Sequence, residues 1–151
     1  MKLNYALKPK DEKNIVKAMV RDIDMSPKHA MAIASKIKGM NVSKAIKLLE
    51  RVVKLETPIP FKRFNTGIGH RKGVDKEKIG RYPVKASKKY LEMLKSLQGN
   101  ASFKGLDPEK LKLIHVEAQK GVTRKGKKPK GRWKLWRVMF VHIQAVAKEE
   151  K

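Results

Sequence analysis

The side chains best suited to acid–base or metal chemistry in this 151-residue sequence are its four histidines, His29, His70, His115 and His142. No two of them have a His-x₃-His spacing, and no carboxylate accompanies any of them at the spacing of a ligand set. His142 lies in an apolar stretch, which favours a hydrogen-bonded structural role. Because the chain has no cysteine, thiolate metal sites and a cysteine nucleophile are excluded. The sequence therefore predicts no catalytic residue, no metal and no cofactor.

A phosphate-binding loop is the second candidate for chemistry. Gly121, Gly126 and Lys127 have P-loop spacing after a predicted strand, but Lys128 stands where Ser or Thr would bind magnesium. Nothing helical follows, so no helix N-terminus would direct N–H groups at a phosphate. We interpret these residues as part of a basic loop and not as a nucleotide site.

Positive charge is the strongest signal in the composition. The net charge is +24, which predicts a polyanionic partner. Two segments, 118–148 and 58–74, contain no Asp or Glu. No acid within them can therefore offset the repulsion between their Lys and Arg side chains. Both contain glycines, which permit close approach of backbone to phosphate. The predicted nucleic-acid-binding residues are Lys28, His29, Lys38, Lys62, Arg63, His70, Arg71, Lys72, Arg81, Lys120, Arg124, Lys125, Lys127, Lys128, Lys130, Arg132, Trp133, Lys134 and Arg137.

Two tryptophans accompany the second basic segment. Trp136 is predicted to be structural, clamping a hairpin by cross-strand packing. For Trp133 two interpretations stay open, the same packing or stacking on unpaired bases. His70 is predicted to stack on RNA or hydrogen-bond to it, and not to catalyse.

A membrane partner is not expected. No run of about 18 apolar residues exists, and the polar N-terminus lacks the apolar core of a secretion signal. A membrane-surface helix would need a broad apolar face, but the apolar faces of this chain are needed for its own core. The sequence has no spare apolar stripe that could form a dimer interface, so no homo-oligomer is expected.

The elements that must position these side chains form one domain over residues 1–151. We expect residues 1–14 to be mobile. Residues 15–25 are predicted to form a strand with Ile23 on the face opposite Val16 and Ala18. Helices are predicted at 26–39, 43–55 and 84–105. Ser26 is the predicted N-cap of the first helix, and its stripe is Ala30, Ile33, Ala34 and Ile37. A basic insert at about 57–83 is predicted to be irregular.

The remaining chain is predicted to be a long β-hairpin at about 111–147, with a tip at about 122–132. Its return strand is apolar on both faces, which predicts a central, buried strand. With a turn near Lys127, each arm has about eight residues beyond the sheet and the tip projects on the order of 25 Å. Such a ribbon is marginal in water, so we expect it to become rigid when RNA surrounds it.

Two stretches of this sequence resemble the twenty-second large-subunit ribosomal protein family, in its archaeal and eukaryotic branch. The helix–turn–helix resembles the family at Ser26, Pro27, Lys28, His29, Ala30, Ile37, Lys38, Gly39, Ala45 and Leu49. The C-terminal stretch is similar at Pro129, Gly131, Arg132, His142, Ile143 and Val146. The resemblance covers nearly the whole chain, and the insert is similar to that of this branch.

The resemblance implies an α+β domain of three helices packed on a three-stranded antiparallel sheet with a long protruding β-hairpin. It further implies a cytoplasmic, non-enzymatic constituent of the large ribosomal subunit that binds large-subunit rRNA and supports its assembly. Its partners would be rRNA, neighbouring large-subunit proteins near the peptide exit tunnel, and the nascent peptide at the hairpin tip. The bacterial tip pattern Pro-Arg-Ala-x-Gly-Arg is shortened here to Pro129-Lys130-Gly131-Arg132, so the tip is expected to be placed differently.

Two other classes of function are weighed against this one. An architectural nucleic-acid-binding protein outside the ribosome could use a basic β-arm with a proline at its tip, but it usually needs a dimer interface. An enzyme acting on RNA would need a carboxylate cluster or a histidine pair, and the sequence offers neither.

Overall fold

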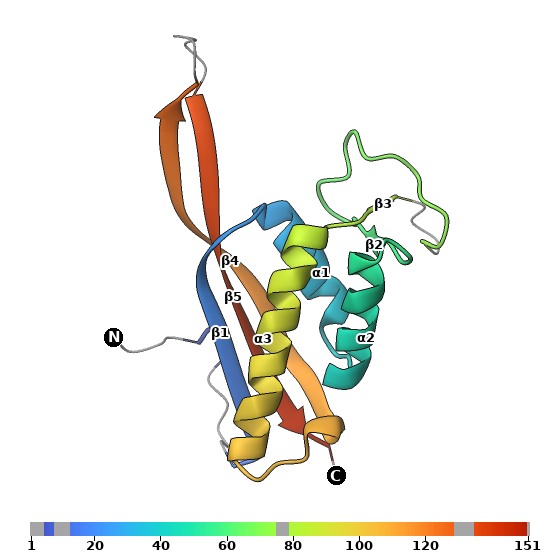
Figure 1. Ribbon diagram of the computed structural model, residues 1–151, viewed down its shortest axis with the longest axis vertical. Helices are drawn as coiled ribbons and strands as arrows, with labels where there is room; N and C mark the ends of the chain where they lie inside the picture. Colours follow the sequence, from blue (N-terminus) through green and yellow to red (C-terminus); the bar gives the residue numbers. More distant parts are fainter. Residues whose placement is uncertain (1–4, 8–12, 75–78, 129–134, 151) are drawn as a thin grey trace.

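The computed structural model describes residues 5–7, 13–74, 79–128 and 135–150, which form a three-stranded antiparallel sheet with helices packed on it (Figure 1). The strands lie in the order β1, β5, β4, where β1 is Ile15–Asp24, β4 is Leu111–Lys127 and β5 is Leu135–Glu149. β5 is central, as its long apolar run predicted, because only a strand between two neighbours is covered on all sides. The predicted α+β architecture is confirmed.

Three helices supply the second layer, α1 (Pro27–Ile37), α2 (Val42–Val53) and α3 (Val84–Phe103). α1 and α3 pack on the sheet, and α2 packs mainly against α3. All four residues of the stripe predicted for α1 are buried. A buried hydrogen bond fixes α3 on α1, because the Tyr90 hydroxyl donates to the carbonyl oxygen of Ala30 at 2.9 Å. Burial raises the pKa of Tyr90, so its phenol stays protonated as the donor.

The turn between α1 and α2 joins the helical layer to the edge of the sheet. Gly39 has a φ of 81°, a left-handed conformation that favours glycine. Its N–H donates to the carbonyl oxygen of Leu113 at 2.8 Å, and the N–H of Leu113 donates to Met40 at 2.8 Å. Asn41 then caps α2 by accepting from the N–H of Ser43 at 2.9 Å. These bonds occupy part of the outer edge of β4.

The basic insert is irregular, as predicted, except where its two ends meet. β2 (Ile59–Pro60) pairs with β3 (Gly80–Arg81). A Cβ on Gly80 would lie 2.8 Å from the Val74 side chain, so only glycine fits there. Ile59 and Phe61 are buried in the core and anchor the insert. Figure 1 shows that the insert leaves the domain at the same end as the hairpin.

The face predicted for Ile23 is wrong. Val16 and Ala18 are buried as expected, but Ile23 is buried with them. The register of β1 against β5 shifts between Val20 and Ile23, and Asp22 has a φ of 52°. A bulge of this kind reverses the alternation of side chains downstream of it.

The hairpin extends beyond the body of the sheet as two strands. β1 ends opposite Phe140, whereas β4 and β5 continue with five further pairs, from Thr123 with Met139 to Lys127 with Leu135. The turn predicted near Lys127 is therefore wrong, because Lys127 is still paired and the connection lies within 128–134. The five pairs add about 16 Å of ribbon, and much of the predicted tip is strand.

The N-terminal segment, predicted to be mobile, has a partner on the sheet at residues 5–7. The N–H of Ala6 donates to the Gln144 side chain at 3.2 Å, and the Lys17 ammonium lies 5.9 Å from the centre of the Tyr5 ring. Gln144 is 1% exposed, and its amide donates to Glu117 at 2.9 Å. The partner lies at the other end of the chain, so local sequence gave no sign of it.

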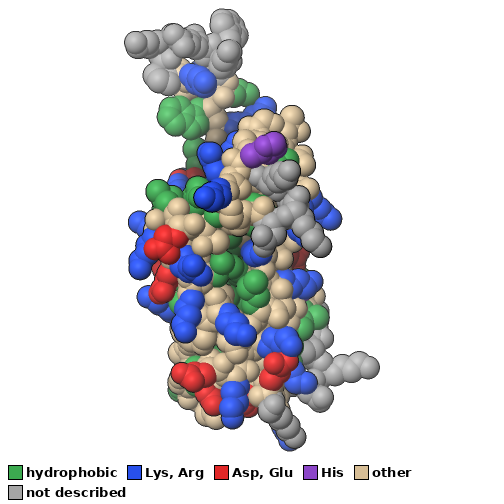
Figure 2. All heavy atoms as spheres, turned by 90° about the vertical axis from the view of Figure 1, so that its right-hand side faces the viewer, with side chains coloured by type: hydrophobic (Ala, Val, Ile, Leu, Met, Phe, Trp, Pro, Cys, Tyr) green, Lys and Arg blue, Asp and Glu red, His purple; other side chains and the backbone are tan. Residues whose placement is uncertain are grey.

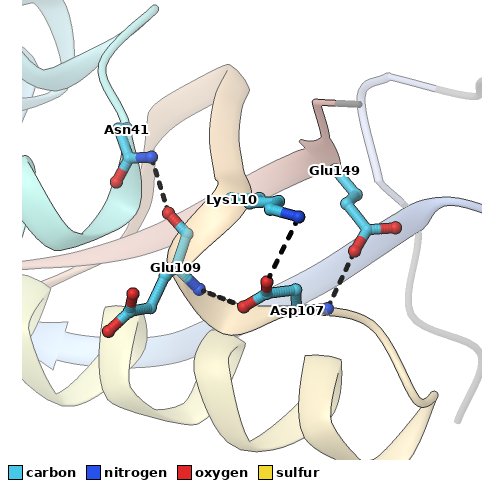
Figure 3. A network of polar contacts seen from close by, with 5 residues as sticks. All are labelled: Asn41, Asp107, Glu109, Lys110 and Glu149. Atoms are coloured by element: carbon cyan, nitrogen blue, oxygen red, sulfur yellow. Dashed lines mark hydrogen bonds and ion pairs between the residues drawn. The ribbon is translucent and has the colours of Figure 1, made fainter.

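Carboxylates hold together the end of the domain opposite the hairpin (Figure 3). Glu149 accepts from the N–H of Asp107 at 2.9 Å. Asp107 in turn accepts from the N–H of Glu109 at 3.1 Å, in a 3₁₀ turn at Pro108–Lys110. The Asn41 amide donates to the carbonyl oxygen of Glu109 at 2.7 Å. The carboxylates of Glu149 and Asp107 thus stabilise the end of the domain that lies away from the basic hairpin. Among the described helices, none is long and apolar enough to cross a bilayer.

Candidate nucleic-acid interface

The hairpin presents a row of cations to solvent. Its described members are all exposed and come from both arms; they are Lys120, Arg124, Lys125, Lys127, Lys128 and Arg137. The other predicted binding residues of the hairpin, Lys130, Arg132, Trp133 and Lys134, lie outside the described residues. Strand pairing holds each arm extended, so the exposed cations are distributed along the length of the ribbon.

One aromatic contact orients a cation of the hairpin. The Arg124 guanidinium lies 5.0 Å from the centre of the Phe140 ring. Such a cation–π contact limits the rotamers of a long side chain while leaving its donors available for phosphate. Phe140 belongs to the apolar run of β5, and nothing in the sequence singled it out.

Trp136, predicted to clamp the hairpin by cross-strand packing, is 54% exposed and pairs across the ribbon with Gly126. It lines a small hollow together with Arg124, Lys125 and Lys127 of the facing arm. Part of the residue therefore packs across the strands, and its exposed part can stack on an unpaired base.

The neck of the hairpin is fixed by His142, which has the hydrogen-bonded role predicted for it. The N–H of Asp22 donates to His142 Nδ1 at 3.0 Å. The ring lies over Gly121, where a Cβ would stand 2.8 Å from His142 Nε2. Gly121 lies in β4, where the register shifts between Lys120 and Thr123, and the described chain after it continues as strand to Lys127 and not as a helix, so the P-loop interpretation is correctly rejected.

A second basic surface is a groove of about 620 Å³ between α1, the insert and β4. It brings together four predicted residues, Lys28 from α1, Lys38 at the C-cap of that helix, and Lys62 and Arg63 from the insert. Lys36 and Phe64, which the sequence analysis did not select, also line it. The helical spacing of Lys28 and Lys36 could have indicated a shared face, but the approach of the insert to α1 is a tertiary contact.

The other predicted residues of α1 and the insert do not line this groove. His29 packs edge-on against the Phe61 ring, with 5.6 Å between ring centres. Burial, and then the nearby Arg81, lower the pKa of His29, so it is neutral at pH 7 and contributes packing more than charge. His70, Arg71, Lys72 and Arg81 are exposed on the insert.

Two histidines each lie near one carboxylate, which the search for ligand-set spacings did not single out. Glu117 lies 3.2 Å from His115 Nε2, and Asp22 lies 3.9 Å from His142 Nδ1. Within the described chain, however, no three metal-ligating side chains gather at one place. One of these pairs lies in the sheet and the other at the neck of the hairpin.

Acidic side chains are unevenly distributed over the surface (Figure 2). On the face with α2 and the insert, Lys and Arg are spread widely, while the visible Asp and Glu lie on one flank and at the end away from the hairpin. The hairpin and the insert therefore form a positive end, which suits a polyanion larger than a nucleotide.

The comparison with known proteins agrees with this geometry. Residues 18–148 match the family described as Ribosomal protein L22p/L17e. The chain belongs to this family. It is 39% identical over 151 residues to the large ribosomal subunit protein uL22 of Haloarcula marismortui, covering 99% of this chain and 97% of that protein. It is 42% identical over 151 residues to the protein of that name from Staphylothermus marinus, covering 97% and 96%. The protein of that name from Archaeoglobus fulgidus is 47% identical over 120 residues, 80% of this chain and 77% of that protein. The resemblance seen in the sequence is confirmed, including its archaeal character.

Proposed function

We propose that this member of the L22p/L17e family is a structural, non-enzymatic constituent of the large ribosomal subunit in the cytoplasm, where it binds large-subunit rRNA and supports its assembly. The observation that carries this is the ribbon that continues five pairs beyond the sheet with exposed cations and no carboxylate. A free ribbon of that kind gains little from its own contacts. Phosphates of a surrounding RNA would supply the negative charge and the contacts that the ribbon itself lacks.

The binding residues of the proposal are the nineteen predicted from the sequence, those outside the described residues included. The hairpin cations would contact rRNA along both arms. The groove cations and the exposed insert would bind a second stretch. Phosphate contacts of this kind fix register and orientation, which is the task of a protein that assembles with a folded RNA.

The same proposal places the hairpin connection, within 128–134, at the wall of the peptide exit tunnel, beside neighbouring large-subunit proteins and the nascent peptide. Its support is the family membership together with the projection of the ribbon from the body of the domain (Figure 1). A projecting arm can reach a narrow channel that a globular body of this size cannot enter.

Salt dependence of binding to large-subunit rRNA tests the first part. If about eight phosphates are contacted, log K should fall against log salt with a slope near −7 by the duplex coefficient, and less steeply for unpaired RNA. Duplex DNA as competitor separates rRNA binding from general architectural binding. A slope shallower than about −2 would mean that the basic surface is not the binding surface. Co-sedimentation with large subunits through high salt provides an independent measurement.

A shortened hairpin tests the tunnel placement. Residues 124–138 are removed, and Thr123 is joined to Met139 through Asn-Gly, which favours a two-residue turn. The core keeps its buried residues, so thermal unfolding should stay within a few degrees of the parent. Ribosomes carrying this variant should assemble, yet differ in their response to a stalling peptide or a tunnel-binding macrolide. An identical response would make the hairpin an rRNA anchor that does not reach the lumen.

A further inference from the structure

The groove between α1, the insert and β4 has a composition that phosphate binding alone does not require. Its rim carries the cations Lys28, Lys36, Lys38, Lys62 and Arg63. Its floor is apolar, with Met31, Ala32, Ala34, Pro60 and Val116 among the lining residues. Charged side chains are enough to bind phosphate, whereas an apolar floor in a groove of about 620 Å³ also fits a flat organic group.

Phe64 supplies an aromatic wall to this groove. It is 46% exposed, although it is a large apolar side chain. Its φ of 57° is in the left-handed region, which a residue with a Cβ occupies only when its surroundings hold it there. The Lys28 ammonium lies 5.3 Å from the centre of its ring. A partly exposed aromatic ring with an ammonium group over it therefore lies at the groove.

Charge decides between the possible occupants. A peptide would place its amide groups against an apolar floor and its side chains against five cations. The one acid among the lining residues, Glu117, is already paired with His115 and the Gln144 amide. An unpaired nucleotide satisfies both features at once, since its base stacks on an aromatic ring and its phosphate pairs with adjacent ammonium groups.

We propose that this groove receives an unpaired rRNA base, which stacks on Phe64 while the flanking phosphates bind Lys28, Lys62 and Arg63. This inference rests on the proposed function and adds to it a base-binding subsite on the globular body, separate from the hairpin. Contacts made only to phosphate would not select a place along the RNA, whereas an extruded base fixes one.

Two variants of the full chain test the subsite, each with a matched control. Phe64→Leu keeps an apolar side chain at the same backbone conformation and removes the flat ring. Its control is Phe103→Leu, because Phe103 is 94% exposed at the end of α3. Ser35→Leu fills the groove from an exposed position on α1, and Ser96→Leu adds the same side chain to an exposed position on α3. Thermal unfolding checks that all four variants fold.

The measurement is chemical probing of base edges and of the backbone on the chain's own large-subunit rRNA, with and without protein. The parent should protect at least one unpaired base, and that base should become reactive with Phe64→Leu and with Ser35→Leu. Both controls should leave it protected. Loss of the stacked base should weaken binding by about fivefold or more.

The inference fails if Phe64→Leu and Ser35→Leu leave every base protection unchanged, or if they alter only backbone protections, since the groove would then hold phosphate alone. If the parent protein itself protects no rRNA, the proposed function fails and the subsite falls with it. The two failures are told apart by the parent's own footprint.

Discussion

Replacing Gly121 by alanine should destabilise the neck of the hairpin, although the change adds a single methyl group to a strand. The added Cβ would stand 2.8 Å from His142 Nε2 and 3.1 Å from the carbonyl oxygen of Phe140. The histidine ring cannot swing away freely, because its Nδ1 accepts from the N–H of Asp22 at 3.0 Å. Either that hydrogen bond or the pairing of β4 with β5 must give way.

The magnitude follows from two opposing effects. Forcing a methyl group into a filled site costs about 1–3 kcal/mol, while a Gly→Ala change stabilises by about 0.4–1 kcal/mol through the unfolded chain. The net loss is about 1–2 kcal/mol. For a chain of this length that lowers the melting temperature by about 3–6 °C.

Urea and thermal unfolding measure the effect, with Gly126→Ala as the control. Gly126 lies in the same strand, and nothing stands within 4 Å of a Cβ built on it, so its replacement should show only the stabilisation of about 0.4–1 kcal/mol that comes through the unfolded chain. A His142→Ala background removes the nearer contact and should reduce the cost of Gly121→Ala, leaving only the Phe140 carbonyl. Equal stability of the Gly121→Ala and Gly126→Ala proteins, or an undiminished cost in the His142→Ala background, would refute this account of the neck.

Four further changes test the globular body. Asn41→Ala should cost about 0.5–2 kcal/mol in urea unfolding, because its side chain caps α2. Ser26→Ala should cost less, since Ser26 makes no side-chain cap hydrogen bond; equal costs would contradict the cap assignment. Tyr90→Phe should cost about 1 kcal/mol by losing its bond to Ala30, and an unchanged urea midpoint would argue against that bond. The pKa of His29 is lowered from 6.5 by burial and by a nearby arginine, so its contribution to stability is complete above pH 6.5 and is lost as the pH falls from there toward the lowered value. His29→Gln should flatten the stability curve in that window, and a curve of unchanged slope would mean that the ring is not desolvated.

Local patterns in the sequence determined the elements and the kind of partner. The stripe of α1, the helix at Val84–Phe103 and the central position of β5 follow from periodicity, which is a property of neighbouring residues. The acid-free segments follow from composition and already indicated a polyanion. The family resemblance could also be read from two short motifs, because their residues are close together in the chain.

Tertiary packing decided everything that joins distant residues. The bulge at Asp22 turned Ile23 into the core, and the pairing of Lys127 with Leu135 moved the turn outward, because register is set by the partner strand and not by the strand itself. Trp136 became exposed because its partner across the ribbon is a glycine. The groove has walls from α1, the insert and β4, so no single stretch of sequence could reveal it. Charge and periodicity can be read from residues that are neighbours in the chain. A concave site, in contrast, exists only once separate elements have packed together.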